Sequence, residues 1–222
     1  MIKDFLGIST EKLLQSGWET IYMLGLSLII GTILGSIIAV ILWLTRKEGL
    51  HPNRFIYEVL NGIINIVRSI PFIILLVCVM PLTKLIVGTR IGTRAAIVPL
   101  VIYIAPYLAR LIENSLLEVG HGIVEAAQSM GANTWQIVVH FVFPEAFGSV
   151  ILALTTGTIG LLGATAMAGY IGGGGVGNLA LTYGYQAFNT NLMVFTVIIL
   201  IVFVWIIQSI GNRLSRKRRT HE

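Results

Sequence analysis

The chain has 222 residues, of which 55% are apolar and only 11% are charged, and its mean hydropathy is +0.87. A soluble domain carries about 25% charged residues, so this composition excludes a soluble enzyme and indicates an integral membrane protein. The formal net charge is +5, and the last ten residues hold five basic ones: Arg213, Arg216, Lys217, Arg218 and Arg219. Beside a membrane such a tail predicts orientation rather than nucleic-acid binding.

The apolar residues form five runs that are long enough to cross a bilayer, since a membrane-spanning helix needs about 20 of them. The runs cover residues 18–44, 56–82, 95–112, 146–168 and 192–210. We therefore predict an all-α polytopic membrane protein with five transmembrane helices in a single domain, residues 1–222. Residues 1–16 mix apolar and charged side chains over too short a length to span, and they predict a helix at the membrane interface.

Basic residues set the predicted orientation. The loop after the first run carries Arg46, Lys47 and Arg54, and together with the basic tail it is expected on the cytoplasmic side. With five spans, the N-terminus is then outside and the C-terminus cytoplasmic. The loop after the second run holds three basic residues that would face outward and oppose this rule: Lys84, Arg90 and Arg94. The basic tail decides between the two orientations.

Small residues recur at every fourth position of the first run, at Ser27, Gly31, Gly35 and Ala39. This spacing places them on one helix face and brings helix backbones close together. The pattern fits packing inside one subunit, which we favour, and it also fits a seam between two copies.

The second run begins with a polar stripe. Glu58, Asn61, Asn65 and Arg68 are three or four residues apart, so they share one helix face, which should avoid lipid. Two interpretations stay open. In the first, Asn61, Asn65 and Arg68 line a polar pathway through the membrane. In the second, the two asparagines bridge Glu58 to Arg68 in a structural network. Pro71 predicts a bend beside Arg68, because proline removes a helix amide.

No motif in the chain predicts catalysis. The run Gly172–Gly177 contains G-x-G-x-x-G, but it lies between two spans and lacks the strand and the acidic residue that a dinucleotide site needs. A G-x-x-x-x-G-K-[ST] motif is absent, so the chain is not expected to hydrolyse nucleotides. The four histidines lack metal-ligand spacing, and Cys78 is the only cysteine. We therefore expect no catalytic, cofactor-binding or metal-binding residue.

The segment 113–144, between the third and fourth runs, is too polar to span and carries glutamates but no Lys or Arg. Residues 123–130 predict a helix that ends at Gly131, because glycine can adopt the left-handed conformation that ends helices. Asn133 then predicts a second helix start, with Gln136 placed to complete a capping box. Pro144 suits the first turn of the next span. The two helices and the glycine turn would project from the bilayer as a bracket.

The residues Glu125-Ala126-Ala127, then Gly131, then Phe141-Val142-Phe143-Pro144 have the spacing EAA-x3-G-x9-I-x-L-P, with Phe at the two aliphatic positions. They resemble the EAA loop of the permease subunits of type I ABC importers. Four further segments resemble the permeases of bacterial methionine ABC importers: 65–76, 95–100, 105–114 and 172–177. The resemblance therefore covers nearly the whole chain.

This resemblance implies a permease subunit of the bacterial inner membrane that imports methionine, with the D enantiomer left open beside the L form. It implies a homodimer around the pathway, two ATP-binding cassette ATPase subunits, and an extracytoplasmic binding protein or lipoprotein. The residues that would dock with the ATPase are Glu125, Ala126, Ala127, Met130, Gly131 and Ala132. The alternatives are an ABC permease for another small amino acid or solute, and a secondary carrier or channel, which would need an ion site at membrane depth.

Overall fold

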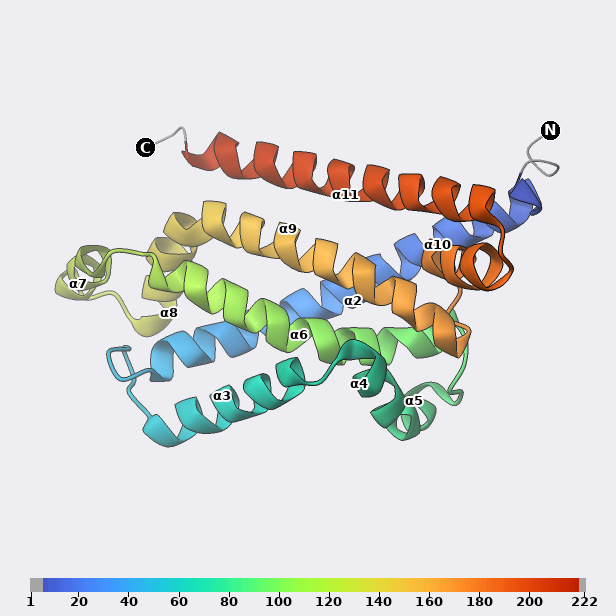
Figure 1. Cartoon of the computed structure of the whole chain (residues 1–222). Helices are drawn as coiled ribbons and strands as arrows, with labels where there is room; N and C mark the ends of the chain where they lie inside the picture. Colours follow the sequence, from blue (N-terminus) through green and yellow to red (C-terminus); the bar gives the residue numbers. More distant parts are fainter. Residues whose placement is uncertain (1–5, 220–222) are drawn as a thin grey trace. The chain divides into compact units, whose positions relative to one another are not determined.

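The computed structural model describes residues 6–219, except the side chains of Tyr170 and residues 217–219, and every regular element in this part of the chain is helical (Figure 1). Three helices are long and apolar enough to cross a membrane: α2 (Thr10–Thr45), α6 (Thr93–Leu117) and α11 (Thr190–Arg219). A fourth crossing joins α8 (Thr134–Gln136), the π-helix η1 (Ile137–Val142) and α9 (Phe143–Ala168). The predicted all-α polytopic membrane fold is confirmed.

The second apolar run, residues 56–82, is not one helix. It is divided into α3 (Arg54–Ser69), α4 (Phe72–Cys78) and α5 (Met80–Val87). The axes of α3 and α4 differ by 106°, and Pro71 lies at the break, where its missing amide and ring interrupt the helix. The bend predicted beside Arg68 is confirmed, and the pair supplies the fifth span if it counts as one broken crossing.

Other boundaries differ from the sequence prediction. Residues 10–16 belong to the 36-residue helix α2, so the prediction of a separate interfacial helix is wrong there, and residues 1–5 lie outside the described part. Helix α6 runs to Leu117, so the predicted loop 113–144 starts as helix. The segment between the fourth and fifth spans is also helical, as η2 (Gly169–Ile171), α10 (Gly175–Asn178) and η3 (Leu179–Gln186).

The chain divides into two compact units, of which unit 2 comprises residues 31–69, 105–157 and 208–222. Its core joins Leu42 of α2, Ile64 of α3 and Ala109 of α6. A Cβ added to Gly35 would lie 2.9 Å from the carbonyl oxygen of Ala105, so only glycine allows this approach of α2 to α6. All four small residues of the α2 stripe are buried within the chain. Packing inside one subunit is therefore confirmed, and the dimer seam is wrong for this stripe.

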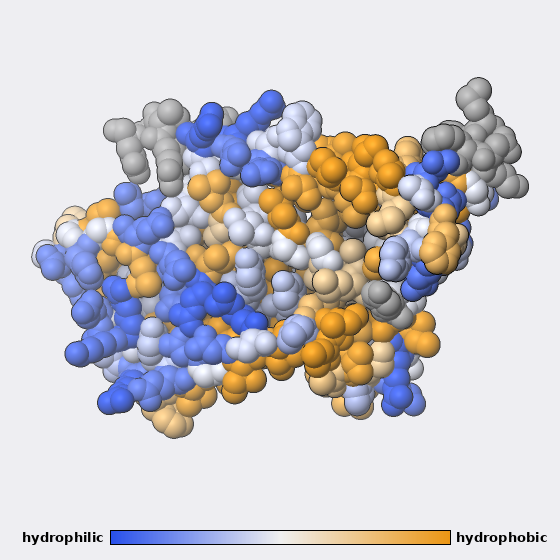
Figure 2. All heavy atoms as spheres, viewed as in Figure 1, coloured by the Kyte–Doolittle hydropathy of each residue, from blue (hydrophilic) through white to orange (hydrophobic). Residues whose placement is uncertain are grey.

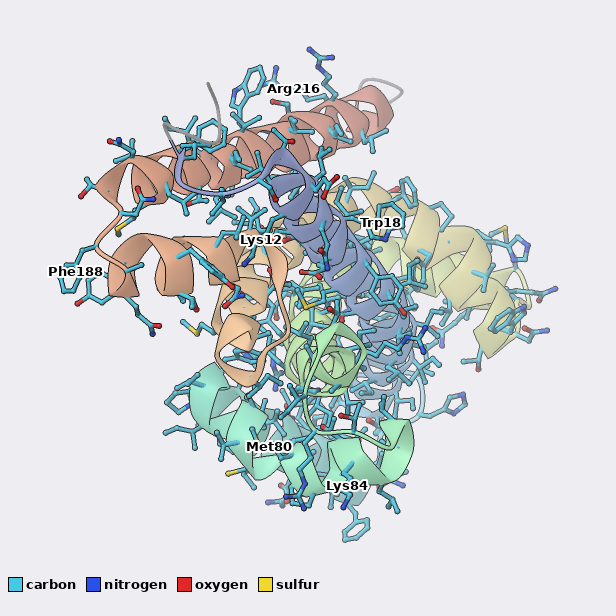
Figure 3. All side chains as sticks on the ribbon, turned by 90° about the vertical axis from the view of Figure 1, so that its right-hand side faces the viewer. Lys12, Trp18, Met80, Lys84, Phe188 and Arg216 are labelled. Carbon is cyan, nitrogen blue, oxygen red and sulfur yellow. The ribbon has the colours of Figure 1, made fainter. Side chains whose placement is uncertain are left out.

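Unit 1 comprises residues 1–30, 70–104 and 158–207. Leu6 and Ile8 pack with Leu179 of η3 and Leu192 of α11, and the side-chain amide of Asn189 donates to the Leu6 carbonyl oxygen at 2.8 Å. The ammonium of Lys12 on α2 (Figure 3) lies 3.5 Å from the ring centroid of Tyr183. These contacts hold the start of α2 against η3 and the start of α11.

Helix α11 changes character along its length. In the view of Figure 2 its surface is apolar over the first part and hydrophilic toward the C-terminus. Its exposed large apolar side chains include Ile201, Trp205 and Ile206, whereas Arg213 and Arg216 are exposed near its end. An apolar surface of this kind needs lipid or a partner helix around it.

Candidate functional site

The predicted bracket is present between α6 and α9. Helix α7 (His121–Ser129) follows α6 after three residues, and Gly131 adopts a left-handed φ of +77°. The Gly131 amide donates to the Gln128 carbonyl oxygen at 2.9 Å, and the Ala132 amide donates to the Ala127 carbonyl oxygen at 3.1 Å. This pair of bonds is the Schellman motif, which satisfies the last carbonyl groups of a helix. The helix end predicted at Gly131 is confirmed.

A capping box starts the next helix, α8. The Asn133 side chain accepts from the Gln136 amide, and the Gln136 side chain accepts from the Asn133 amide, both at 2.9 Å. Only Ala132 separates Gly131 from this box, so the backbone is fixed by hydrogen bonds on both sides of the turn. We name residues 118–136 the coupling bracket. Its conformation is set locally and needs no partner to define it.

The coupling bracket is tied to the rest of unit 2. Both α7 and α8 pack against η1. The His51 ring is hydrogen-bonded to the Thr134 hydroxyl at 2.8 Å, which links the loop after α2 to α8. The Ser149 hydroxyl of α9 donates to the Glu118 carboxylate at 2.6 Å. Side-chain hydrogen bonds therefore link the coupling bracket to α9 and to the loop after α2.

One face of the coupling bracket is open. Glu125 and Ala126 are exposed, and so are two large apolar side chains, Met130 at 67% and Trp135 at 70%. Ala127, by contrast, is fully buried in the chain itself. Of the two alanines that the sequence predicts to dock, Ala127 packs α7 onto its own chain and Ala126 is exposed. Their docking with the ATPase stays a prediction. Exposed Met and Trp side chains are typical of interfaces, and the sequence analysis missed Trp135.

The polar stripe of α3 does not form the predicted network. Glu58 pairs with Arg54 at 2.6 Å, and the guanidinium of Arg68 lies over the ring of Tyr107, 5.5 Å from its centroid. The structural interpretation, in which asparagines bridge Glu58 to Arg68, is therefore wrong. Asn65 and Arg68 are exposed, and a pathway lined by them and Asn61 stays a prediction.

Asn61 instead joins a buried ion pair on α6. Arg110 donates to the Glu113 carboxylate at 2.6 Å and with its other terminal nitrogen to the Asn61 side-chain oxygen. Only 1% of Glu113 is exposed, so its charge needs a compensating partner, and Arg110 is hydrogen-bonded to it. The sequence signal was an Arg and a Glu three residues apart on an apolar helix, which the analysis left unused. This cluster of Asn61, Arg110 and Glu113, which we name the α3–α6 polar cluster, links α3 to the helix that leads into the coupling bracket.

Among the described residues, no group of three His, Cys, Asp or Glu side chains could hold a metal ion. The glycine-rich segment 172–177, rejected above as a dinucleotide site, is held by α2. The Gly175 amide donates to the Glu19 carboxylate, and the Val176 amide donates to the Thr20 hydroxyl, each at 2.8 Å. Two backbone amides of this segment are thus engaged with side chains of α2.

Comparison with known proteins agrees with this geometry. Residues 31–220 match a family model described as the binding-protein-dependent transport system inner membrane component. The chain is 46% identical over 216 residues to the probable D-methionine transport system permease protein MetI of Vibrio cholerae, covering 97% of this chain and 96% of the relative. It is 40% identical over 213 residues to the methionine import system permease protein MetP of Bacillus subtilis, covering 96% of each chain.

A solved structure of the MetNI methionine ABC transporter in an inward-facing conformation superimposes with a TM-score of 0.92 and 41% sequence identity. The match covers 94% of this chain and 97% of that chain. The resemblance inferred from the EAA spacing is confirmed. Because the family model and these relatives cover nearly the whole length, the chain belongs to the family of inner-membrane components of binding-protein-dependent transport systems.

Proposed function

We propose that the chain is the permease subunit of an ATP-driven importer of methionine. It forms a homodimer around the pathway, two separate ATPase subunits bind and hydrolyse ATP, and an extracytoplasmic binding protein delivers the substrate. The observation that carries this proposal is the coupling bracket, a rigid and exposed helix pair with EAA spacing. The names of the relatives from Vibrio cholerae and Bacillus subtilis supply the substrate.

The coupling bracket suits the transmission of force. It follows α6 directly, and it continues through η1 into α9. We propose that Glu125, Ala126, Met130, Gly131 and Ala132 seat it in a groove of the ATPase, with Ala127 bracing α7 from behind. When ATP draws the two ATPase subunits together, both coupling brackets move, and α6 and α9 turn between inward-open and outward-open arrangements. ATP can shift this equilibrium only through contacts that differ between the two states.

Reconstitution tests the function. The chain, the ATPase and the binding protein are placed in liposomes, and accumulation of radiolabelled methionine is followed with ATP or with an ion gradient. We expect uptake with ATP only, and none with a catalytically inactive ATPase. Uptake driven by the ion gradient alone would identify a secondary carrier. If ATP drives uptake of another amino acid that the binding protein delivers, and methionine is not taken up, the chain is an ABC permease but methionine is not its substrate.

We propose that the N-terminus faces outward and the C-terminus inward. In unit 2 the hydrogen bond between His51 and Thr134 supports one common side for the loop after α2 and the coupling bracket. The Ser215 hydroxyl donates to the Gly148 carbonyl oxygen at 3.0 Å, which supports the same side for the end of α11. Lysine and arginine in that loop and tail favour the cytoplasm, although the side chains of Lys217, Arg218 and Arg219 lie outside the described ones.

This orientation predicts how single cysteines react. In a Cys78→Ser background, Ser129→Cys on α7 and Thr89→Cys in the loop before α6 are each treated with a thiol reagent that does not cross membranes. We expect intact cells to be labelled at residue 89 only, and inverted vesicles at residue 129 only. The opposite pattern would reverse the orientation.

Glu125→Gln should weaken ATPase binding. The coupling bracket carries glutamates but no lysine or arginine, so we infer a basic rim on the ATPase groove. Exposed ion pairs contribute roughly 0.2–1 kcal/mol, which corresponds to an affinity loss of up to about fivefold. Titration of the purified permease with ATPase at low and at high salt measures this loss of affinity. Salt screens exposed charges, so the difference between wild type and Glu125→Gln should disappear at high salt. Glu145→Gln, with the same charge change outside the coupling bracket, is the control. If wild type, Glu125→Gln and Glu145→Gln bind the ATPase with equal affinity at both salt concentrations, docking depends on shape and not on charge.

A further inference from the structure

Unit 1 contains a cavity of about 480 Å³ between the start of α2 and the segment that leads into α6. Its lining includes Trp18, Glu19 and Tyr22 from α2, and Ile91 and Arg94 from residues 89–94. Trp18 on α2 is labelled in Figure 3. The volume lies in the range of small-molecule sites, about 300–1,000 Å³. The lining joins one acidic and one basic side chain to an aromatic and aliphatic wall.

The acidic side chain is held in place. One oxygen of Glu19 accepts from the Gly175 amide at 2.8 Å, and the other accepts from the Gln15 side-chain amide at 2.9 Å. Gly174 adopts a left-handed φ of +76°, and a Cβ there would lie 2.0 Å from the Glu19 carboxylate, so the glycine makes room for it. A carboxylate has about four acceptor positions. Two are used, and the remaining ones can accept from a ligand in the cavity.

The basic side chain has no partner in the described part of the chain. Arg94 is exposed, and its guanidinium makes no ion pair or hydrogen bond with any described residue, including Glu19 on the same cavity. A guanidinium offers five donors in a planar fork that matches a carboxylate. The lining of the cavity therefore contains a fixed negative group and an unpaired positive group.

The wall between these charges is apolar. Trp18 is 68% exposed and Ile91 is 67% exposed, and Tyr22 is also exposed. Aromatic side chains make favourable contacts with a thioether sulfur. A ligand that satisfies all of these groups carries an ammonium, a carboxylate and an uncharged side chain.

We propose that this cavity binds the zwitterion of an α-amino acid, with its ammonium on Glu19, its carboxylate on Arg94 and an apolar side chain against Trp18 and Tyr22. Methionine fits this description, so the inference rests on the proposed function. In the proposed orientation the cavity opens at the extracytoplasmic end of the permease, where substrate released by the binding protein first arrives. Because Glu19 also holds the amide of Gly175, an occupied site is connected to the glycine-rich segment.

Direct binding tests this site without the binding protein. The permease–ATPase complex is placed in lipid nanodiscs, and equilibrium binding of radiolabelled methionine is measured. Competitors are 4-(methylthio)butanoate, which lacks the ammonium, and methioninol, which lacks the carboxylate. The wild-type complex should bind each analogue about tenfold or more weakly than methionine, since each loses a charge-assisted contact.

The variants assign each charge. Glu19→Gln should bind methionine and 4-(methylthio)butanoate equally, and Arg94→Gln should bind methionine and methioninol equally. Glutamine keeps an oxygen that accepts from the Gly175 amide, and retention of the ATPase shows that the variants are assembled. Arg90→Gln, an exposed arginine outside the cavity lining, should behave as wild type.

Two results would overturn the site: no saturable binding by the wild-type complex of any of the twenty amino acids, or wild-type selectivity in both the Glu19 and Arg94 variants. Failure of the proposed function gives a different result. If the complex binds another apolar amino acid with the same dependence on Glu19 and Arg94, the site stands and methionine is wrong. If zwitterion binding persists but uptake ignores ATP, the site stands and the ABC function is wrong.

Discussion

Replacing Gly131 with valine is expected to reduce ATP-driven uptake about tenfold or more, while the chain still inserts in the membrane. A Cβ at this position would meet nothing within 4 Å, but the backbone φ is +77°. The obstacle is therefore conformation and not space. The left-handed region costs an ordinary residue roughly 1–2 kcal/mol, and a β-branched one more. Valine would open the Schellman turn and change the angle between α7 and α8.

A graded series separates conformation from bulk. Asparagine is larger than alanine, yet it enters the left-handed region more readily. Uptake in liposomes should therefore fall in the order Gly131, then Asn, then Ala, then Val, with ATP hydrolysis by the complex measured beside it. We expect hydrolysis to continue without transport in the valine variant. An order that follows side-chain volume, or full uptake by the valine variant, would remove the turn from the coupling mechanism.

The coupling bracket could be predicted from the sequence because its geometry is local. Gly131 ends one helix, and Asn133 with Gln136 starts the next, through hydrogen bonds between residues at most five positions apart. Helix ends of this kind follow from residue type and spacing alone. The break at Pro71 could be predicted for the same reason, although the 106° angle depends on the packing around it.

Contacts between distant segments could not be predicted. Glu58 has Arg54 four residues away on its own helix, whereas Arg68 could be linked to it only through Asn61 and Asn65, and the asparagines turn out to have other surroundings. Asn61 selects Arg110, 49 residues away, which requires the packing of α3 on α6. Ala127 is buried because α7 packs against η1, although in the sequence it is equivalent to Ala126. Helical periodicity gives the relative directions of side chains on one helix, but only the fold shows which residues of other helices they contact.

Arg110→Met is expected to cost the assembled permease about 3–5 kcal/mol, because the buried carboxylate of Glu113 loses its hydrogen-bonded ion-pair partner. Only 1% of Glu113 is exposed, and Arg110 is its ion-pair partner at 2.6 Å. A loss of this size corresponds to a fall in thermal midpoint of about 6–20 °C for a chain of this length. Tryptophan emission of the purified complex during heating measures it, together with the yield of assembled complex.

Two comparisons identify burial as the cause. The double variant Arg110→Met with Glu113→Met removes both charges, so it should recover most of the lost stability, as apolar replacement of a buried pair commonly does. Arg54→Gln breaks the ion pair between Arg54 and Glu58, which has the same 2.6 Å length but side chains that are 89% and 61% exposed. Because water solvates the Glu58 carboxylate after the change, the thermal midpoint should stay the same. If the double variant is as unstable as Arg110→Met alone, the shape of Arg110 matters rather than its charge. If the double variant is stable but transports poorly, its packing is intact and only the polar link between α3 and α6 is missing. The α3–α6 polar cluster then serves to position α6 relative to the coupling bracket.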